Sequence, residues 1–356
     1  MTMRTGTAAA ARDADEGSLM WPAHGDSQDD GTDVEKPVKE GQDLGVQKQR
    51  QSRQLLLLIV QLCCMAAVGG YCLYATRAEP VATGFFCDDD SIRFPVLRQT
   101  VPAAEAWVIT LVGPLFFLLL VDWLASREFG DRFVCGTSVD IGCCRVPPLL
   151  RAYYKSIGGF LFAMLCSSAV TLTGKICVGR LRPHFIDACR PDWSHIRCSD
   201  NTGFLYVDHF ECTSGNAEAI REARVSFPSG HSSSAMCAMV YLALYLQSRL
   251  VWLSQAAASA RDLRPSPVPS STKCTRALWR TLKGLCPFLQ LLAFAVAFFV
   301  GISRIRDRYH HPTDVLAGFC VGFLAALYAG FYIAGFGSWR EAAEYAAQKE
   351  EMDLEV

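Results

Sequence analysis

The stretch LLLLIVQLCCMAAVGGYCLYA, from Leu55 to Ala75, decides the fold class of this chain. It carries no charged residue over the length of about 20 apolar residues that a helix needs to cross a bilayer. A second charge-free run, FLQLLAFAVAFFVGI, extends from Phe288 to Ile302. A helix in a soluble core seldom runs this long without a polar face. The sequence therefore predicts an integral membrane protein.

Apolar segments recur along the chain and predict six membrane spans, at roughly residues 54–76, 104–125, 152–174, 232–252, 286–303 and 315–337. Only helices satisfy their backbone groups inside lipid without closing a barrel, so we expect an all-α polytopic membrane protein. Residues 1–53 are polar and poor in aliphatic side chains, which predicts a disordered tail. The expected parts are thus a tail at 1–53, a six-span domain at 54–337 and a second tail at 338–356.

Basic residues beside the spans predict the orientation. The segment QKQRQSR precedes the first span, and six cations lie between the fourth and fifth spans: Arg261, Arg264, Lys273, Arg276, Arg280 and Lys283. The positive-inside rule predicts that both termini are cytosolic. We expect the protein to lie in the plasma membrane or in a membrane of the secretory pathway. Loops 3–4 and 5–6 then face the extracellular or lumenal side, yet they too are rich in arginine, and this excess calls for a functional explanation.

The same topology places four cysteines in an oxidising space: Cys87, Cys189, Cys198 and Cys212. Four cysteines allow three connectivities. Of these we favour a Cys198–Cys212 bridge within one loop.

The first arginine-rich cluster is GKICVGRLRPHF, from Gly174 to Phe185, at the end of the third span. Lys175, Arg180 and Arg182 lie within eight positions. Cations that snorkel to a membrane interface explain this pattern as well as a functional site does. A phosphate clamp is the alternative, because guanidinium groups bind phosphate oxygens in a bidentate manner.

The second cluster is VSFPSGHSSSAM, from Val225 to Met236. Proline, serine and glycine permit a sharp turn that leaves the amides of Ser229 and Gly230 unpaired at the start of a helix. The positive end of a helix dipole there favours an anion, with His231 beside it. A serine-rich helix cap with an incidental histidine is the simpler alternative.

The third cluster is GISRIRDRYHHPTDVLAG, from Gly301 to Gly318, between spans five and six. Pro312 favours a helix that begins there. Asp314 then lies in the first turn, where its carboxylate can fix the tautomer of an imidazole. Spacing alone does not choose between His310 and His311 as its partner, and a surface cluster of salt bridges is the alternative.

All three clusters fall on one predicted face of the membrane. Together they offer a surplus of cations, free amides, two separate histidines and a carboxylate, which suits a phosphate monoester of about −1.5 to −2 charges. The chain has no HExxH motif, and CDDD (Cys87 to Asp90) is the one acidic run predicted to face outward. We therefore expect arginine rather than a metal ion to stabilise the reacting charge.

These motifs resemble a known family. Lys175-(six residues)-Arg182-Pro183, Pro228-Ser229-Gly230-His231 and Ser303-Arg304-(five residues)-His310-(three residues)-Asp314 are similar to the three-part signature of the type 2 phosphatidic acid phosphatase superfamily. GFFCDDDSIRFP (Gly84 to Pro95) and GRLRPHFIDACRPDW (Gly179 to Trp193) resemble the animal-type lipid phosphate phosphatases in particular. The resemblance covers about residues 54–337.

The resemblance implies a role for each matching residue. His310 is the expected nucleophile that forms a phosphohistidine, Asp314 orients it, and His231 protonates the leaving alkoxide and later assists water. Five further residues are expected to bind the phosphoryl group: Lys175, Arg182, Ser229, Gly230 and Arg304. No cofactor or metal is expected.

The implied substrates are phosphatidate, lysophosphatidate, sphingosine 1-phosphate and ceramide 1-phosphate. The net charge of −1 and the absence of a basic, aromatic stripe give no indication of a nucleic-acid partner, and homo-oligomerisation is left open. The main alternative is a catalytically silent scaffold of the same family that binds lipid phosphates. A transporter is disfavoured because the cations lie at span ends.

Overall fold

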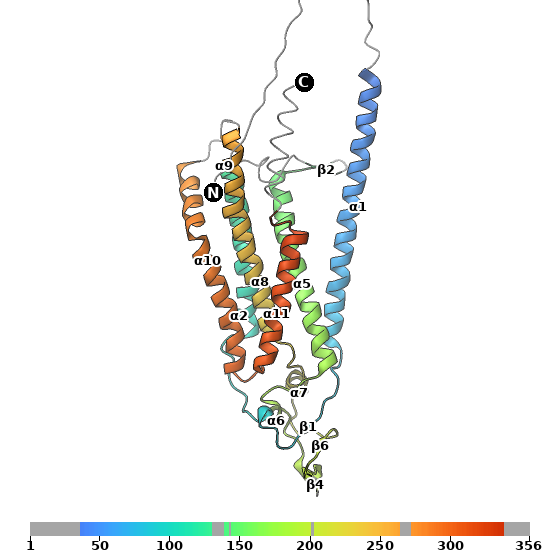
Figure 1. Ribbon diagram of the computed structural model, residues 1–356. Coiled ribbons are helices and arrows are strands. Elements are labelled where there is room, and N and C mark those ends of the chain that lie inside the picture. Colours follow the sequence, from blue (N-terminus) through green and yellow to red (C-terminus); the bar gives the residue numbers. More distant parts are fainter. Residues whose placement is uncertain (1–35, 130–138, 142–143, 201–202, 264–271, 338–356) are drawn as a thin grey trace, which may run out of the picture. The chain divides into compact units, whose positions relative to one another are not determined.

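A computed structural model of the chain describes residues 36–129, 139–141, 144–200, 203–263 and 272–337 (Figure 1). The chain divides into two compact units, Met1–Gln49 and Arg50–Val356, and the second contains the candidate site. The long helices are α1 (Lys36–Arg77), α3 (Gly113–Phe129), α5 (Pro148–Val178), α8 (Gly230–Leu246), α9 (Leu253–Leu263), α10 (Lys273–Arg306) and α11 (Pro312–Tyr328). The shorter helices are η1 (Asp90–Ile92), α2 (Ala103–Trp107), η2 (Val108–Val112), α6 (Phe185–Cys189), η3 (Trp193–His195), α7 (Ala217–Ala223), η4 (Gln247–Trp252) and η5 (Ala329–Ile333).

Strands are few and short. β1 (Phe85–Phe86) pairs with β6 (Tyr206–Val207), β2 (Val139–Ile141) with β3 (Cys144–Val146), and β4 (Ser199–Asp200) with β5 (Gly203–Phe204), all antiparallel. The described residues are thus mostly helical, as expected.

Among the described residues, six helical stretches are long and apolar enough to cross a membrane, which confirms the six predicted spans. They are Leu58–Arg77, Ala103–Phe129, Leu149–Val178, Gly230–Ala258, Lys273–Arg306 and Pro312–Ile333. The fold is that of a polytopic all-α membrane protein.

Two helices begin earlier than the apolar pattern suggests. Helix α1 starts at Lys36, inside the segment 1–53 that is expected to be a disordered tail, while residues 1–35 lie outside the described part. Lys, Gln, Glu and Arg are good helix formers and extend a helix once the apolar span has nucleated it. Helix α10 likewise starts at Lys273, where the side chain of Thr272 caps the amide of Thr275.

Helix α8 is the most buried of the six spans and packs against α5, α10 and α11. Two glycines of α11 let the α8 and α11 backbones approach closely. A Cβ atom on Gly318 would lie 2.6 Å from the carbonyl oxygen of Ser229, and one on Gly322 would lie 2.2 Å from that of Ser233. Small residues four apart are a typical device for close packing of membrane helices.

A buried ion pair connects three spans away from the arginine-rich loops. Asp122 of α3 lies 2.9 Å from Nε of Arg249 in η4, and both side chains are almost fully buried. The hydroxyl of Ser156 in α5 donates to the same carboxylate at 2.6 Å. Tyr241 of α8 in turn donates to the carbonyl of Ser156 at 2.8 Å. This polar network fixes α3, α5 and α8 relative to one another.

The short elements α6, α7, β1, β4 and β6 gather beyond one end of the long helices, here called the loop end (Figure 1). Their small apolar core includes Phe85, Ile92, Phe185 and Val207. Helix α5 stops at this end because Gly179 adopts a left-handed conformation with φ of 58°. Gly179, the C-cap of α5, packs against the carbonyl oxygen of Val81. The loop after α1 and the loop after α5 are therefore in contact.

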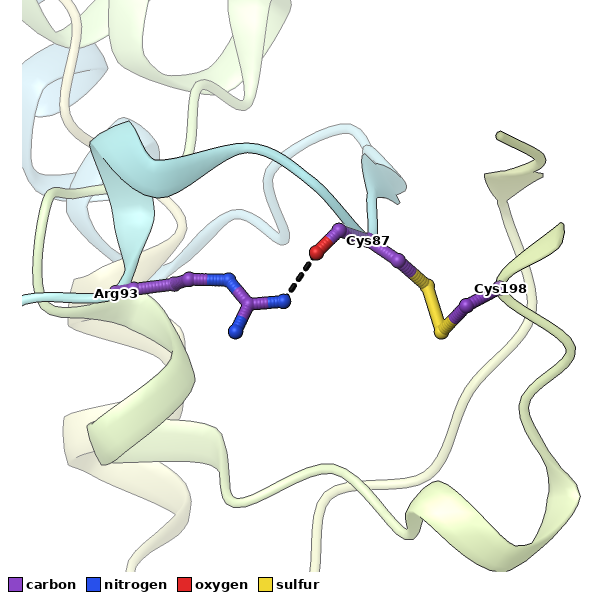
Figure 2. The surroundings of a disulfide bond; sticks show 3 residues. All are labelled: Cys87, Arg93 and Cys198. Atoms are coloured by element: carbon purple, nitrogen blue, oxygen red, sulfur yellow. Dashed lines mark hydrogen bonds between the residues drawn. A yellow bond between two sulfur atoms is a disulfide. The ribbon is translucent and has the colours of Figure 1, made fainter. Parts of the chain in front are cut away.

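Two disulfides fasten these loops, and they differ from the expected pairing. Cys87 is bonded to Cys198 and Cys189 to Cys212, so the Cys198–Cys212 bridge is wrong. The β1–β6 pairing brings residues 78–102 against residues 179–229, which places Cys87 beside Cys198. Figure 2 shows this bridge and the guanidinium of Arg93, which donates a hydrogen bond to the carbonyl of Cys87.

Candidate active site

The three clusters meet at the loop end of α5, α8 and α11. Arg180 of the first cluster forms an ion pair with Asp314 of the third, with 2.6 Å between NH1 and Oδ1. The amide of Ser229 in the second cluster donates to the carbonyl of Asp314 at 3.0 Å. The imidazole of His310 bonds the carbonyl of Ser226 at 2.7 Å. Segments more than 80 positions apart therefore form one site.

His310 has a defined tautomer. Its Nδ1 lies 2.7 Å from the carbonyl oxygen of Ser226, which only accepts, so Nδ1 carries the proton. The lone pair is then on Nε2. Burial, together with the charges of Arg182 and Lys175, lowers the pKa of His310 to about 3, although Asp314 opposes the shift. The ring is thus neutral and can act as a nucleophile over the whole physiological range of pH.

Asp314 is completely buried and heavily bonded. Its Oδ2 accepts from the hydroxyl of Ser226 at 2.6 Å and from the amide of His311 at 3.0 Å. The same oxygen lies 3.8 Å from Nδ1 of His310. The imidazole of His311 turns instead to the carbonyl of Leu181, at 3.1 Å. The structure therefore resolves the choice that spacing left open: His310 is the ring that faces Asp314.

The start of α8 differs in one respect from the expected anion cradle. The amide of Ser229 is bonded to Asp314, so the expectation that it points out unpaired is wrong. Ser229 is instead the buried N-cap, and its hydroxyl accepts from Ser232. Among the described residues, the amides of Gly230 and His231 have no partner. They are the free amides of this helix start, one position later than predicted.

Each arginine of the site has a carboxylate partner. Besides the Arg180–Asp314 pair, NH1 of Arg182 bonds Glu222 of α7 at 3.0 Å, and NH2 of Arg304 bonds Asp307 at 2.7 Å. With Lys175, the four cations exceed the three carboxylates by one positive charge while both histidines are neutral. The surplus is smaller than the sequence suggested, because Glu222 and Asp307 lay outside the matched motifs.

Tyr309 packs between two of these arginines. The guanidinium carbons of Arg182 and Arg304 lie 5.4 and 5.3 Å from the centre of its ring. The centre of the His184 ring lies 4.6 Å from that of Tyr309, and Nδ1 of His184 bonds the carbonyl of Arg308 at 2.8 Å. Tyr309 thus holds the two guanidinium groups near one another.

Three nitrogen atoms of the site are buried without a hydrogen-bond partner: Nε of Arg182, Nε2 of His231 and Nε of Arg304. Each comes from a different cluster. Leaving a buried donor unsatisfied costs about 1–3 kcal/mol, and more when the group is charged. A bound anion with several oxygen acceptors would satisfy all three.

Lys175 completes the set of predicted residues. It lies in the last turn of α5, and a Cβ atom added to Gly230 would come within 4.0 Å of its Nζ. The ammonium group therefore lies beside the free amides at the start of α8. All eight residues singled out in the sequence are together in the structure.

Metal ligands are not grouped in this way. Within the described ranges, no three His, Cys, Asp or Glu side chains are placed to hold a metal ion. The acidic run Cys87–Asp90 begins with a disulfide-bonded cysteine, and its Asp89 caps η1 by accepting from the amide of Ser91. The donors that do converge are amides, imidazoles and guanidinium groups, which bind anions.

Sequence reasoning missed several supporting residues. They are Gln99, Thr100, Glu222, Ser226, Asp307 and Tyr309. Asp307 and Tyr309 lie inside the quoted third cluster, so their neighbourhood was visible. No local signal connects Gln99 or Thr100 to a residue about 200 positions away.

Comparisons with known proteins agree with this geometry. Residues 157–335 match the family model described as the PAP2 superfamily. The chain is 32% identical to phospholipid phosphatase 1 of Mus musculus over 292 residues, 82% of this chain and 88% of that protein. It is 33% identical to phospholipid phosphatase 2 of Homo sapiens over 310 residues, 85% of this chain and 91% of that protein. No solved structure matches the chain.

Proposed function

Since this chain belongs to the PAP2 superfamily and is a membrane-embedded phosphatase, we propose that it hydrolyses lipid phosphates through a phosphohistidine, without a metal ion. The substrate class is phosphatidate, lysophosphatidate, sphingosine 1-phosphate and ceramide 1-phosphate. The relatives are phospholipid phosphatases by name, and a site at the ends of spans can reach a lipid headgroup while the tails remain in the bilayer.

The single observation that carries this proposal is the trio of unpaired buried nitrogens on Arg182, His231 and Arg304. A phosphoryl group has three peripheral oxygens and a leaving oxygen, all of which accept hydrogen bonds. The two arginine nitrogens and the amides of Gly230 and His231 would bind the peripheral oxygens, with Lys175 and Ser229 alongside. Donors that are already in place stabilise the charge of the transition state without reorganisation.

In the first step Nε2 of His310 attacks phosphorus. The bond from phosphorus to the lipid oxygen breaks, its electron pair goes to that oxygen, and the proton comes from Nε2 of His231, which takes up a proton when the phosphate anion binds beside it. The neutral, fixed tautomer of His310 supports this assignment, because its lone pair is on the nitrogen that does not bond Ser226. Asp314 and the Ser226 carbonyl stabilise the positive charge that the ring gains.

In the second step water attacks phosphorus of the phosphohistidine and gives a proton to His231. The phosphorus–nitrogen bond breaks, and its electron pair returns to Nε2 of His310. Two easier displacements replace one difficult hydrolysis, as in other covalent catalysts.

The orientation is part of the proposal. Basic residues before the apolar part of α1 and around the start of α10 favour cytosolic termini, and the loop end would then be extracellular or lumenal. Two disulfides at the loop end agree with an oxidising compartment.

The test measures phosphate release from phosphatidate and lysophosphatidate by the full chain in detergent micelles with EDTA. We expect turnover by the wild type, none by His310→Ala, and normal turnover by the control His195→Ala, whose ring is exposed outside the site. Radiolabelled phosphate should accumulate on His231→Ala as an acid-labile adduct and be absent from His310→Ala.

Three results would contradict parts of the proposal. If the folded wild type releases no phosphate from any lipid phosphate, the chain is a binding scaffold. If release requires magnesium, the arginine-based mechanism is wrong. If His310→Ala retains turnover, another residue is the nucleophile.

A further inference from the structure

The loop between the first two spans, residues 78–102, contacts the third cluster through Thr100. The amide of Thr100 donates to Oδ2 of Asp307 at 2.6 Å, and its hydroxyl donates to Oδ1 at 2.7 Å. Both carboxylate oxygens are thus held by one residue that lies 207 positions earlier in the chain.

Asp307 transmits this contact to a buried arginine. Its Oδ2 accepts from NH2 of Arg304 at 2.7 Å, and Arg304 is 1% exposed. Burial alone would raise the pKa of Asp307, but the hydrogen bonds from Thr100 and Arg304 lower it below its ordinary value. Asp307 is therefore a carboxylate that links the loop to the guanidinium group.

The guanidinium of Arg304 is restrained on three sides. NH2 bonds Asp307, NH1 bonds the side-chain oxygen of Gln99 at 3.1 Å, and the ring of Tyr309 lies 5.3 Å from the central carbon. Nε has no partner. Two adjacent residues of the first loop, Gln99 and Thr100, thus determine where the unpaired N–H of Arg304 points.

The loop has a fixed position of its own. The Cys87–Cys198 disulfide anchors it, the amide of Phe94 donates to the carbonyl of Pro183 at 2.9 Å, and Arg308 lies 4.0 Å over the ring of Phe94. A rigid support is what a group needs if it is to keep a donor in the productive geometry.

From these contacts we infer that Thr100 is a positioning residue of the phosphatase site, acting through Asp307 to hold Nε of Arg304 towards the phosphoryl group. The inference rests on the proposed function. It assigns to the first loop, which contains none of the residues of the three-part signature, a part in the charge stabilisation of the reaction.

The test compares Thr100→Val with Thr100→Ser, using lysophosphatidate hydrolysis by the full chain in detergent micelles. Thr100→Val removes the hydroxyl donor and keeps the shape and the amide. We expect kcat/KM to fall about three- to tenfold, somewhat less than a fully buried hydrogen bond to a charged group would give, because Thr100 is exposed. Thr100→Ser should stay within about twofold of the wild type.

Thr83→Val is the matched control. Thr83 lies in the same loop, and its hydroxyl donates to the carbonyl of Val178 at 3.4 Å, away from Asp307. The same chemical change there should leave kcat/KM unaltered. In an Asp307→Asn background, Thr100→Val should have almost no further effect, because residues that act in series are not additive.

A second measurement separates positioning from mere folding. The inhibition constant of orthovanadate, a mimic of the phosphoryl transition state, should rise in Thr100→Val by the factor that kcat/KM falls. The temperature of thermal inactivation should match that of the wild type. A variant that only loosened the fold would lower this temperature. In that case the vanadate inhibition constants of the other two variants decide the question. The constant of Thr100→Ser should match that of the wild type, and the constant of Asp307→Asn should rise.

The inference is overturned if Thr100→Val keeps wild-type kcat/KM, or if its effect is undiminished in Asp307→Asn. It is also overturned if vanadate inhibits Thr100→Val and Asp307→Asn as it does the wild type. Failure of the proposed function gives a distinguishable result. The wild type itself would then release no phosphate, and the inference, which rests on that function, would be refuted as well.

Discussion

Replacement of Arg182 by lysine should separate two tasks that one guanidinium performs. NH1 of Arg182 bonds Glu222 at 3.0 Å, while Nε is buried without a partner in the site. The group also lies over the ring of Tyr309 at 5.4 Å. The single ammonium of lysine can serve Glu222 or the phosphoryl group, but it lacks the planar fork that serves both.

The size of the effect follows from the bond that is lost. One hydrogen bond to a charged group contributes about 1.5–3 kcal/mol, which corresponds to a roughly 10- to 150-fold lower kcat/KM. The assay is initial-rate hydrolysis of lysophosphatidate in detergent micelles, with thermal inactivation measured on the same samples. We expect KM and kcat both to change, because the phosphate is bound in the ground state and in the transition state.

Arg224→Lys is the matched control. Arg224 is in the same loop, and its guanidinium packs over Phe185 and Phe210 at 5.3 and 5.0 Å, outside the site. Its kcat/KM should stay within about threefold of the wild type, since a cation–π contact there contributes only about 0.5–2 kcal/mol to the fold. If Arg182→Lys retains more than half of wild-type kcat/KM, or if Arg224→Lys loses as much, Nε of Arg182 does not bind the phosphoryl group.

Three further perturbations test the fold and the electrostatics. Gly322→Ala should lower stability by about 1–3 kcal/mol or more, because its Cβ would lie 2.2 Å from the carbonyl oxygen of Ser233, and thermal unfolding in detergent measures this. Asp122→Ala should cost about 3–5 kcal/mol in the same assay, since it removes the carboxylate partner of buried Arg249. Acidification from pH 7.5 to 5 should also destabilise the protein: the pKa of His310 is about 3 when folded and about 6.5 when unfolded, so the unfolded state takes up the proton first. This histidine alone costs about 2 kcal/mol at pH 5, and His310→Gln should make unfolding correspondingly less dependent on pH between 5 and 6.5.

Each of these has its own check. Gly284→Ala should be neutral or slightly stabilising, because nothing lies within 4 Å of the added Cβ. The pair Asp122→Leu with Arg249→Met should be more stable than Asp122→Ala alone, since it leaves no buried charge. A variant His310→Gln with the pH dependence of the wild type would show that other groups account for the acid sensitivity.

The spans could be predicted because their signal is local. A charge-free run of bilayer length identifies each one, whatever surrounds it. Their ends could not, since α1 and α10 continue into polar sequence that still forms helix. The ends of an apolar run indicate where the chain leaves the lipid. The ends of the helix are set by its backbone hydrogen bonds, which continue beyond that point in α1 and α10.

The site was predictable to the extent that its residues lie in short motifs. Asp314 lies in the first turn of α11 and His310 only two positions before that helix begins, so one short motif contains both. The disulfide partners, the tautomer fixed by Ser226 and the Glu222–Arg182 pair depend on how two long loops pack. That packing is set by the β1–β6 pairing and a small apolar core, which no spacing along the chain reveals.

The close contact between α8 and α11 has a consequence for protein engineering. The proposed acid, His231, and the proposed nucleophile, His310, begin or precede helices whose backbones touch at Gly318 and Gly322. A chimera that exchanged one of these helices with a relative would have to reproduce the same glycine spacing, or the two histidines would separate. The smallest segment that can be transplanted with its chemistry intact is therefore the helix pair, and shuffling at single-span boundaries should yield folded but silent proteins.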